Sequence, residues 1–321
     1  MNITAAMVKD LREKTGAGMM DCKNALVETK GDMEGAVDWL RTKGLVKAAG
    51  KAGRVAAEGV VAVATEGKRA AMVEVNSETD FVARNPDFQK LARGIAEAAL
   101  STDGTLDRIL EAKLSNGKVV ETAVREAIAG IGENITVRRA ALVNVKDGVV
   151  GSYVHAAVAP GLGKIGVLVG VESAGNSNGL EAIGKQVAMH IAAANPLAIR
   201  VEELDPELVA RERSIYAEQA RASGKPESIV DKMVEGRMRK FHEEAVLLSQ
   251  IFVLDTEKTV AKALESAEVG VGGAIGLTEF VCFRLGEGIE KKSTNFAAEV
   301  AAAAGIPRTN ANAEDQDDED E

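Results

Sequence analysis

Aromatic residues are scarce in this chain of 321 residues, where they make up 3%. Hydrophobic residues still reach 46%, so a core has to consist mainly of alanine, valine, isoleucine and leucine. Such small side chains predict closely packed helices and thin sheets. The length corresponds to roughly two or three domains.

Cysteine is scarce as well: Cys22 and Cys282 stand far apart and form no CxxC pair. This spacing argues against a disulfide scaffold. The three histidines show no paired ligand spacing, so we expect neither a metal site nor a cofactor. The hydrophobic region of a signal peptide is missing before Lys9. The most apolar stretch, 149–171, is interrupted by Pro160 and several glycines. We therefore expect a cytoplasmic protein without a membrane-spanning segment.

Motifs of nucleotide-binding enzymes are missing or lie in the wrong context. The P-loop pattern GxxxxGK[ST] does not occur. Residues 161–166 match GxGxxG, but the dinucleotide fingerprint requires a helix to open within the motif, and 167–169 look like a strand. We interpret the motif as a flexible hairpin loop. Cys22 has no evident histidine partner and is expected to be a buried thiol on a helix, so we expect no enzymatic activity.

Negative charge is concentrated at the end of the chain. The net charge is −10, and residues 314–321 hold seven acids and no base. Without them the chain holds 39 basic and 42 acidic residues, which is nearly neutral. We expect 308–321 to be a disordered acidic tail, because a polyacidic run repels itself and has nothing apolar to bury. A nearly neutral body also argues against tight direct binding to nucleic acid.

The first segment, 1–54, predicts a bundle of three short helices. The pattern favours helices over about 4–14, 19–29 and 33–42, with glycines between them. We expect the third helix to end at Gly44, because glycine is the usual residue just beyond a helix C-terminus.

Residues 55–290 show the order strand, strand, helix, helix, strand twice. The first copy has its elements at about 59–64, 70–75, 87–100, 121–129 and 135–143. The second has them at about 148–154, 165–171, 180–194, 256–264 and 276–284. We predict an α+β fold with a duplicated core of three-stranded antiparallel sheets. One subdomain spans 55–145, and the other combines 146–195 with 243–288.

A long insertion, 196–242, divides the second copy. Two amphipathic helices joined by Gly224-Lys225-Pro226 predict an antiparallel helical hairpin of the coiled-coil kind. A further helix is expected within a C-terminal module, 289–307. Helical hairpins of this kind occur in monomers and in dimers, so a dimer is possible and the oligomeric state stays open.

Several strings resemble one protein family. They are LREKTGAGMMDCKNAL at 11–26, EVNSETDFVARN at 74–85, VEGRMRKF at 234–241 and GEGIEK at 286–291. Together with the order of segments, they resemble the elongation factor Ts family from residue 4 to about 306. The resemblance implies a guanine nucleotide exchange factor whose partner is elongation factor Tu, and an opening bundle of the ubiquitin-associated type. The tail beyond Pro307 departs from the family pattern.

The loop Thr79-Asp80-Phe81-Val82 lies between an expected strand and an expected helix. From the residues alone, we favour the interpretation that Phe81 folds back onto the core and Asp80 caps a turn, because most aromatic side chains are structural. The resemblance reverses this preference. It implies that Phe81 wedges between helices of the GTPase and that the loop disturbs its magnesium site.

The resemblance also implies further contacts with elongation factor Tu, made by Met19, Met20, Lys23, Ile131, Gly132, His155 and Val246. For some of these residues an ordinary structural role is an open alternative. The two methionines could fill a core. His155 could be an ordinary surface histidine, and Val246 could simply pack in the core.

Two other functions are compatible with parts of the sequence. The opening bundle, 1–54, could recognise a peptide or a ubiquitin-like fold and make the protein a binding module. The glycine loop at Gly161 could hold a nucleotide cofactor in an enzyme. Deletion of the bundle separates the first alternative from exchange, and a thermal shift with nucleotides would reveal the second.

Overall fold

The computed structural model describes residues 3–15, 17–51 and 53–290. Its first three helices are α1 (Ala5–Thr15), α2 (Met19–Glu28) and α3 (Met33–Ala49). Their small core contains Leu11, Cys22, Ala25, Leu26 and Ala36, so Cys22 is the buried helical thiol that the sequence predicts. Thr4 begins α1, because its hydroxyl accepts a hydrogen bond from the backbone N–H of Met7 at 3.3 Å.

The third helix does not end at Gly44, contrary to the expectation, and continues to Ala49. Gly44 faces α6 (Val120–Ile131), where a Cβ atom on the glycine would lie 3.0 Å from the Cβ of Ala129. The glycine therefore allows two helices to approach closely.

The first copy of the repeat forms a sheet in the order β3-β2-β1-β5, with all neighbours antiparallel. Its strands are β1 (Glu58–Glu66), β2 (Arg69–Ser77), β3 (Thr136–Asn144) and β5 (Leu162–Gly163). The prediction of three strands is wrong here, because Leu162 and Gly163 pair with Ala62 and Val61 and add a short fourth strand.

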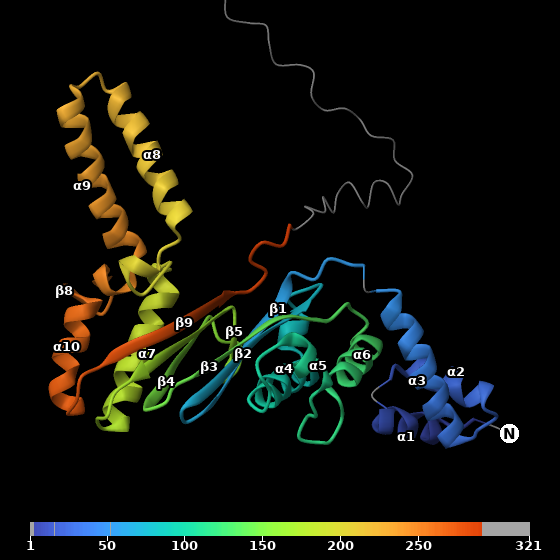
Figure 1. Cartoon of the computed structure of the whole chain (residues 1–321). Coiled ribbons are helices and arrows are strands. Elements are labelled where there is room, and N and C mark those ends of the chain that lie inside the picture. Colours follow the sequence, from blue (N-terminus) through green and yellow to red (C-terminus); the bar gives the residue numbers. More distant parts are fainter. Residues whose placement is uncertain (1–2, 16, 52, 291–321) are drawn as a thin grey trace, which may run out of the picture. The chain divides into compact units, whose positions relative to one another are not determined.

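Helices cover one face of this sheet (Figure 1). They are α4 (Pro86–Ala99), α5 (Leu106–Glu111) and α6. α5 was not predicted from the sequence; it is short and contributes the fully buried Ile109. Phe88 and Ile95 of α4 are also fully buried, so the largest side chains of this core lie between helices and sheet.

The second copy forms a three-stranded antiparallel sheet, β4-β6-β9, with helices against it. Its elements are β4 (Gly148–His155), β6 (Ile165–Glu172), α7 (Ser177–Ala194), β7 (Ile251–Phe252), β8 (Asp255–Thr259), α10 (Val260–Val271) and β9 (Gly276–Arg284). The helix expected over 256–264 begins only at Val260. Residues 256–259 belong instead to β8, which pairs with β7 through Thr259 and Asp255, and the hydroxyl of Thr259 caps α10 by accepting from Lys262 N–H at 3.3 Å.

Side chains from both sheets form one apolar cluster, which includes Val61 and Met72 of the first sheet and Leu168 of the second. Gly166 in β6 permits this packing. A Cβ atom there would lie 2.6 Å from both the sulfur of Met72 and a methyl carbon of Val61. The GxGxxG motif is therefore a short strand, a turn and a sheet contact. No helix opens within it, so the structure contradicts the dinucleotide interpretation.

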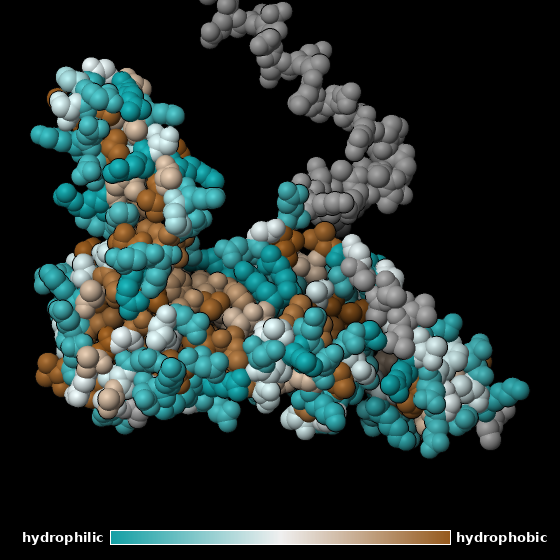
Figure 2. Space-filling model, viewed as in Figure 1, coloured by the Kyte–Doolittle hydropathy of each residue, from teal (hydrophilic) through white to brown (hydrophobic). Residues whose placement is uncertain are grey.

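The insertion forms the helical hairpin of α8 (Pro206–Ala222) and α9 (Glu227–Ala245). Ala220 and Val230 are buried between the two helices, together with Met238. Hydrophilic side chains cover most of the visible hairpin surface (Figure 2). Among the described helices, none combines the length and apolar character needed to cross a membrane. The expected C-terminal helix and the acidic tail, from residue 291 onward, lie outside the described residues.

Candidate partner-binding site

The loop between β2 and α4 presents Phe81 to solvent. The side chain of Phe81 is 77% exposed, while that of Val82, its neighbour, is buried in the core. The interpretation that Phe81 folds back onto the core is therefore wrong. Asp80 is exposed beside it. Phe81 and Asp80 are thus both accessible at the surface of this loop.

Local hydrogen bonds hold the base of this loop. A 3₁₀ turn, η1 (Val82–Arg84), follows Phe81, whose carbonyl accepts from Arg84 N–H at 3.1 Å. Asn85 then caps α4, because its side-chain oxygen accepts from Asp87 N–H at 2.9 Å and from Phe88 N–H at 3.2 Å. Phe81 therefore precedes a rigid turn and a well-capped helix.

Two acids connect this loop to the turn between α6 and β3. The carboxylate of Glu133 accepts from Thr79 N–H at 2.9 Å and from the Thr79 hydroxyl at 2.6 Å. In the opposite direction, Glu78 accepts from Asn134 N–H at 2.6 Å. We call Glu78, Thr79, Glu133 and Asn134 the cross-loop clamp. It brings Thr79–Val82 together with Ile131 and Gly132, which end α6 just before Glu133.

The segment that follows α3 reaches the same place. The backbone carbonyl of Arg54 accepts from the Asn134 side chain at 2.8 Å, and its guanidinium lies 3.4 Å from Glu78. Lys51 donates a hydrogen bond to the carbonyl of Gly132. Lys51, Arg54 and the acids of the clamp were not predicted from the sequence. No local pattern reveals them, because their partners lie tens of residues away along the chain.

The predicted contacts on α2 lie in a different element from the loop. Met19 and Met20 are 49% and 65% exposed, so neither fills the core of the bundle. Lys23 is exposed on the same helix, whose opposite face buries Cys22 and Leu26. These three residues form a separate exposed patch.

The two remaining predicted contacts differ in burial. His155 is exposed at the end of β4, and its Nδ1 atom lies 3.1 Å from the hydroxyl of Tyr153. Val246 is only 1% exposed and packs with Ala198 and Ala245 below the hairpin. Its burial favours the packing alternative, because its side chain has almost no surface to offer to a partner.

Comparison with known proteins gives the family of this chain. The family model described as Elongation factor TS matches residues 78–287, a range that begins within the clamp. The elongation factor Ts of Sinorhizobium fredii is 59% identical over 305 residues, which cover 95% of this chain and 99% of that protein. The elongation factor Ts of Parvibaculum lavamentivorans is 60% identical over 303 residues, which cover 94% and 98%. This chain belongs to the elongation factor Ts family.

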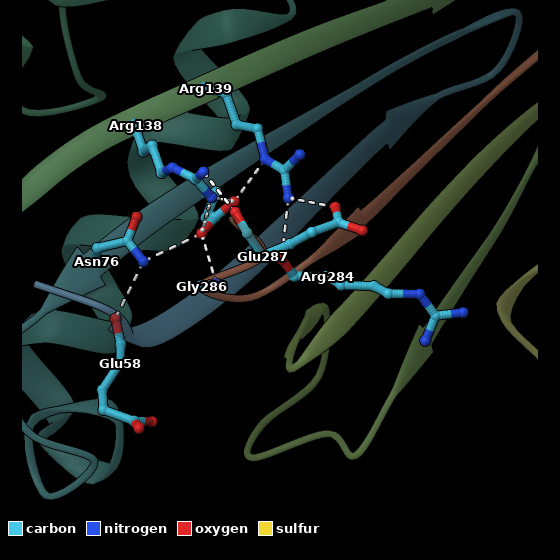
Figure 3. A network of polar contacts seen from close by, with 8 residues as sticks. Glu58, Asn76, Arg138, Arg139, Arg284, Gly286 and Glu287 are labelled. Atoms are coloured by element: carbon cyan, nitrogen blue, oxygen red, sulfur yellow. Dashed lines mark hydrogen bonds and ion pairs between the residues drawn. The ribbon is translucent and has the colours of Figure 1, made fainter. Parts of the chain in front are cut away.

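In this member of the family, a buried carboxylate anchors the last matched residues to the first sheet (Figure 3). Glu74 of β2 is fully buried and bonds to Arg138 at 3.1 Å and to Arg139 at 2.5 Å. It also accepts from the backbone N–H of Gly286 at 2.8 Å, and Arg139 lies 3.3 Å from Glu287. Burial alone raises the pKa of Glu74, but the bonds from Gly286, Arg139 and Asn76 outweigh it and leave the pKa lowered. Glu74 therefore stays ionised and holds 286–287 against β2 and β3.

Clusters of residues that could bind a metal ion are not present within the described residues.

Proposed function

We propose that this protein is a guanine nucleotide exchange factor in translation elongation, and that its partner is elongation factor Tu. Membership of the elongation factor Ts family supports the process and the partner. The observation that carries the mechanism is Phe81, an exposed aromatic ring on a loop that is fixed at both ends. No side chain of this protein takes part in a bond-breaking step.

Phe81 acts as a wedge in this proposal. Burial of a phenylalanine side chain contributes about 1.5–3 kcal/mol, which is available when the ring enters the partner. A GTPase holds GDP through backbone amides, a lysine and a magnesium ion that bridges the phosphates. When the ring separates the helices that carry the magnesium ligands, the hold on GDP weakens. Thr79, Asp80 and Val82 belong to the same loop, and the buried Val82 serves as its anchor.

Exchange then follows from coupled binding. The factor binds the nucleotide-free GTPase more tightly than the loaded form, and GDP weakens binding of the factor by the same ratio. The factor also has to bind the loaded form to some extent, so that a ternary intermediate forms. A contact made by several separate elements suits this requirement better than one tight pocket.

The other family contacts complete this surface. Ile131 and Gly132 adjoin the Phe81 loop through the clamp, and we assign them to the same contact. Met19, Met20 and Lys23 offer a second patch on α2, and His155 offers a third at the end of β4. Val246 supports the fold below the hairpin rather than the contact.

Release of a fluorescent GDP from elongation factor Tu tests the proposal. A small amount of the protein should speed release from a large excess of the loaded GTPase, since the factor is not consumed. Added GDP should weaken binding of the factor to the nucleotide-free GTPase. Unchanged release at every concentration of the factor would contradict the proposed function.

A further inference from the structure

The cross-loop clamp has a reciprocal arrangement. Each of the two connections supplies one carboxylate and one backbone N–H, and each carboxylate crosses to the other connection. Glu133 uses both of its oxygens, one for Thr79 N–H and one for the Thr79 hydroxyl. Hydrogen bonds of this kind, in which the acceptor is charged, are among the strongest in proteins.

The clamp leaves little freedom to the exposed residues. Thr79 is fixed by Glu133, and Val82 is fixed by burial in the core, so that only Asp80 and Phe81 lie between two anchors. A flexible loop would lose conformational entropy on binding and would present the ring in many orientations. The clamp removes this cost before the partner arrives.

The second copy of the repeat indicates that the fold itself does not need such a clamp. There, the carboxylate of Glu268 near the end of α10 serves the connection that follows its own helix, where it accepts from Ile275 N–H at 3.0 Å. The loop between β6 and α7 uses Ser173 to accept from Gly175 N–H at 3.1 Å. The two corresponding connections are bridged by a backbone hydrogen bond, from Asn176 N–H to the carbonyl of Val271 at 2.8 Å, rather than by a reciprocal pair of carboxylates.

We propose that Glu133 and Glu78 are positioning residues for exchange, which hold the Phe81 loop in the geometry that opens the nucleotide site. They act through Phe81 and do not touch the nucleotide. This inference rests on the proposed function and names a further requirement of the same site.

Two substitutions probe the clamp. Glu133→Gln places an amide N–H₂ group opposite one of the two Thr79 donors, because glutamine has one oxygen where glutamate has two. Thr79→Val removes the hydroxyl donor and keeps the shape of the side chain. Thr79→Ser keeps the donor and serves as the conservative variant. Glu121→Gln is a matched control on α6, because its exposed ion pair with Arg125 lies within the helix.

The readout is the maximal rate of fluorescent GDP release at saturating factor, beside the factor concentration that gives half of that rate. Glu133→Gln and Thr79→Val should each lower the maximal rate about tenfold, because the loop loses a hydrogen bond to a charged group. The half-saturating concentration should change much less, since the other patches still bind. Thr79→Ser should recover most of the rate that Thr79→Val loses, and Glu121→Gln should keep the wild-type rate.

The same substitutions in a Phe81→Ala background separate positioning from general destabilisation. There they should leave the maximal rate unchanged within about twofold, because residues that act through a missing ring have nothing left to position. Hydrogen exchange of residues 78–84 should become faster in Glu133→Gln without the partner. If Glu133→Gln fails to fold, the comparison of Thr79→Val with and without Phe81→Ala tests the positioning role instead.

The inference is overturned if Glu133→Gln and Thr79→Val release GDP at the wild-type rate, or if they slow release equally with and without Phe81. Failure of the proposed function gives a different result. In that case the wild-type protein does not speed release at all, and hydrogen exchange alone decides whether the clamp orders the loop.

Discussion

The two copies of the repeat differ most in the connection between their second strand and the following helix. In the first copy, residues 78–85 form a loop that exposes Phe81 and is held by the clamp. In the second copy, residues 173–176 form a short turn, in which the N–H of Asn176 bonds to the carbonyl of Val271 at 2.8 Å. One scaffold thus carries a projecting loop at one site and a closed turn at the other, and function is expected in the loop.

The scaffold itself is repeated in detail. Gly59 lies near the start of the first copy's ladder with φ of +119°, and a Cβ atom there would lie 2.2 Å from the carbonyl oxygen of Val75. Gly148 begins the second ladder with φ of +146°, and a Cβ atom there would lie 2.0 Å from the carbonyl oxygen of Val171. Asn85 and Asn176 cap the corresponding helices α4 and α7. The two copies thus share the closely fitted backbone sites, while the exposed aromatic belongs to the first copy alone.

The largest effect on stability is expected from Phe88→Ala. Phe88 is fully buried, and truncation of a core phenylalanine typically lowers the free energy of unfolding by about 3–5 kcal/mol. Phe81→Ala, seven positions away, should change the free energy of unfolding by less than about 0.5 kcal/mol, since the ring is exposed. Denaturant unfolding measures both. Equal losses would contradict the assignment of one ring to the core and the other to a partner.

Gly59→Ala and Gly148→Ala should be similarly damaging in the two copies. Each adds a Cβ atom against a carbonyl oxygen at a backbone conformation that alanine rarely adopts, which should cost about 2–4 kcal/mol. Gly67→Ala is a matched control with φ of +59° and open space around its Cβ, and should cost about 1 kcal/mol. A much smaller loss at one ladder than at the other would weaken the claim of a shared scaffold.

The copies should respond to acid in different pH ranges. His190 of the second copy is buried; burial lowers its pKa, and the bond to Gln250 only partly offsets this. The unfolded chain therefore takes up this proton at a higher pH than the folded protein does. The stabilisation that neutral His190 provides thus decreases as the pH drops below about 6.5. The pKa of Glu74 in the first copy is also lower in the folded protein, so acid again weakens the fold. The stabilisation that ionised Glu74 provides is lost as the pH falls below about 4.3 towards the folded pKa.

Unfolding free energies of the wild type, His190→Gln and Glu74→Gln between pH 7.5 and 3.5 test this order. Each group changes stability by at most about 1.4 kcal/mol per pH unit. The difference in unfolding free energy between wild type and His190→Gln should shrink as the pH falls below about 6.5. The corresponding difference for Glu74→Gln should shrink only as the pH falls below about 4.3. The reverse order would contradict the account of both sites.

The smallest effect on stability is expected at the two helix caps. Asn85→Ala and Asn176→Ala should each cost about 1 kcal/mol, because each removes a side-chain acceptor at a helix N-terminus. Only Asn85→Ala should also slow GDP release, since Asn85 ends the Phe81 loop. If Asn176→Ala slows release as much, the two connections do not differ in function.

The sequence predicts most elements of the two copies, because β-branched runs and amphipathic helices are local signals. It fails where distant contacts decide. Gly44 resembles a helix end and instead lies against Ala129 of another helix. Leu162 and Gly163 resemble a loop, and become a strand only because β1 offers a free edge beside them.

The candidate site was predictable only in part. Phe81 and Phe88 are the same residue type, and composition cannot tell which one is exposed. The family resemblance pointed to Phe81 as a contact, and the structure exposes its side chain. The clamp could not be predicted, because Glu133 is separated from Thr79 by 54 residues. The role of Val246 was left open between contact and packing, and its burial favours packing.

The most direct test of the account compares wild type with Phe81→Ala in the release of fluorescent GDP from elongation factor Tu at saturating factor. We expect wild type to speed release and Phe81→Ala to lower the maximal rate by roughly tenfold or more, because the free energy of burying the ring is lost. Equal release by both proteins would contradict the role of Phe81 as the wedge.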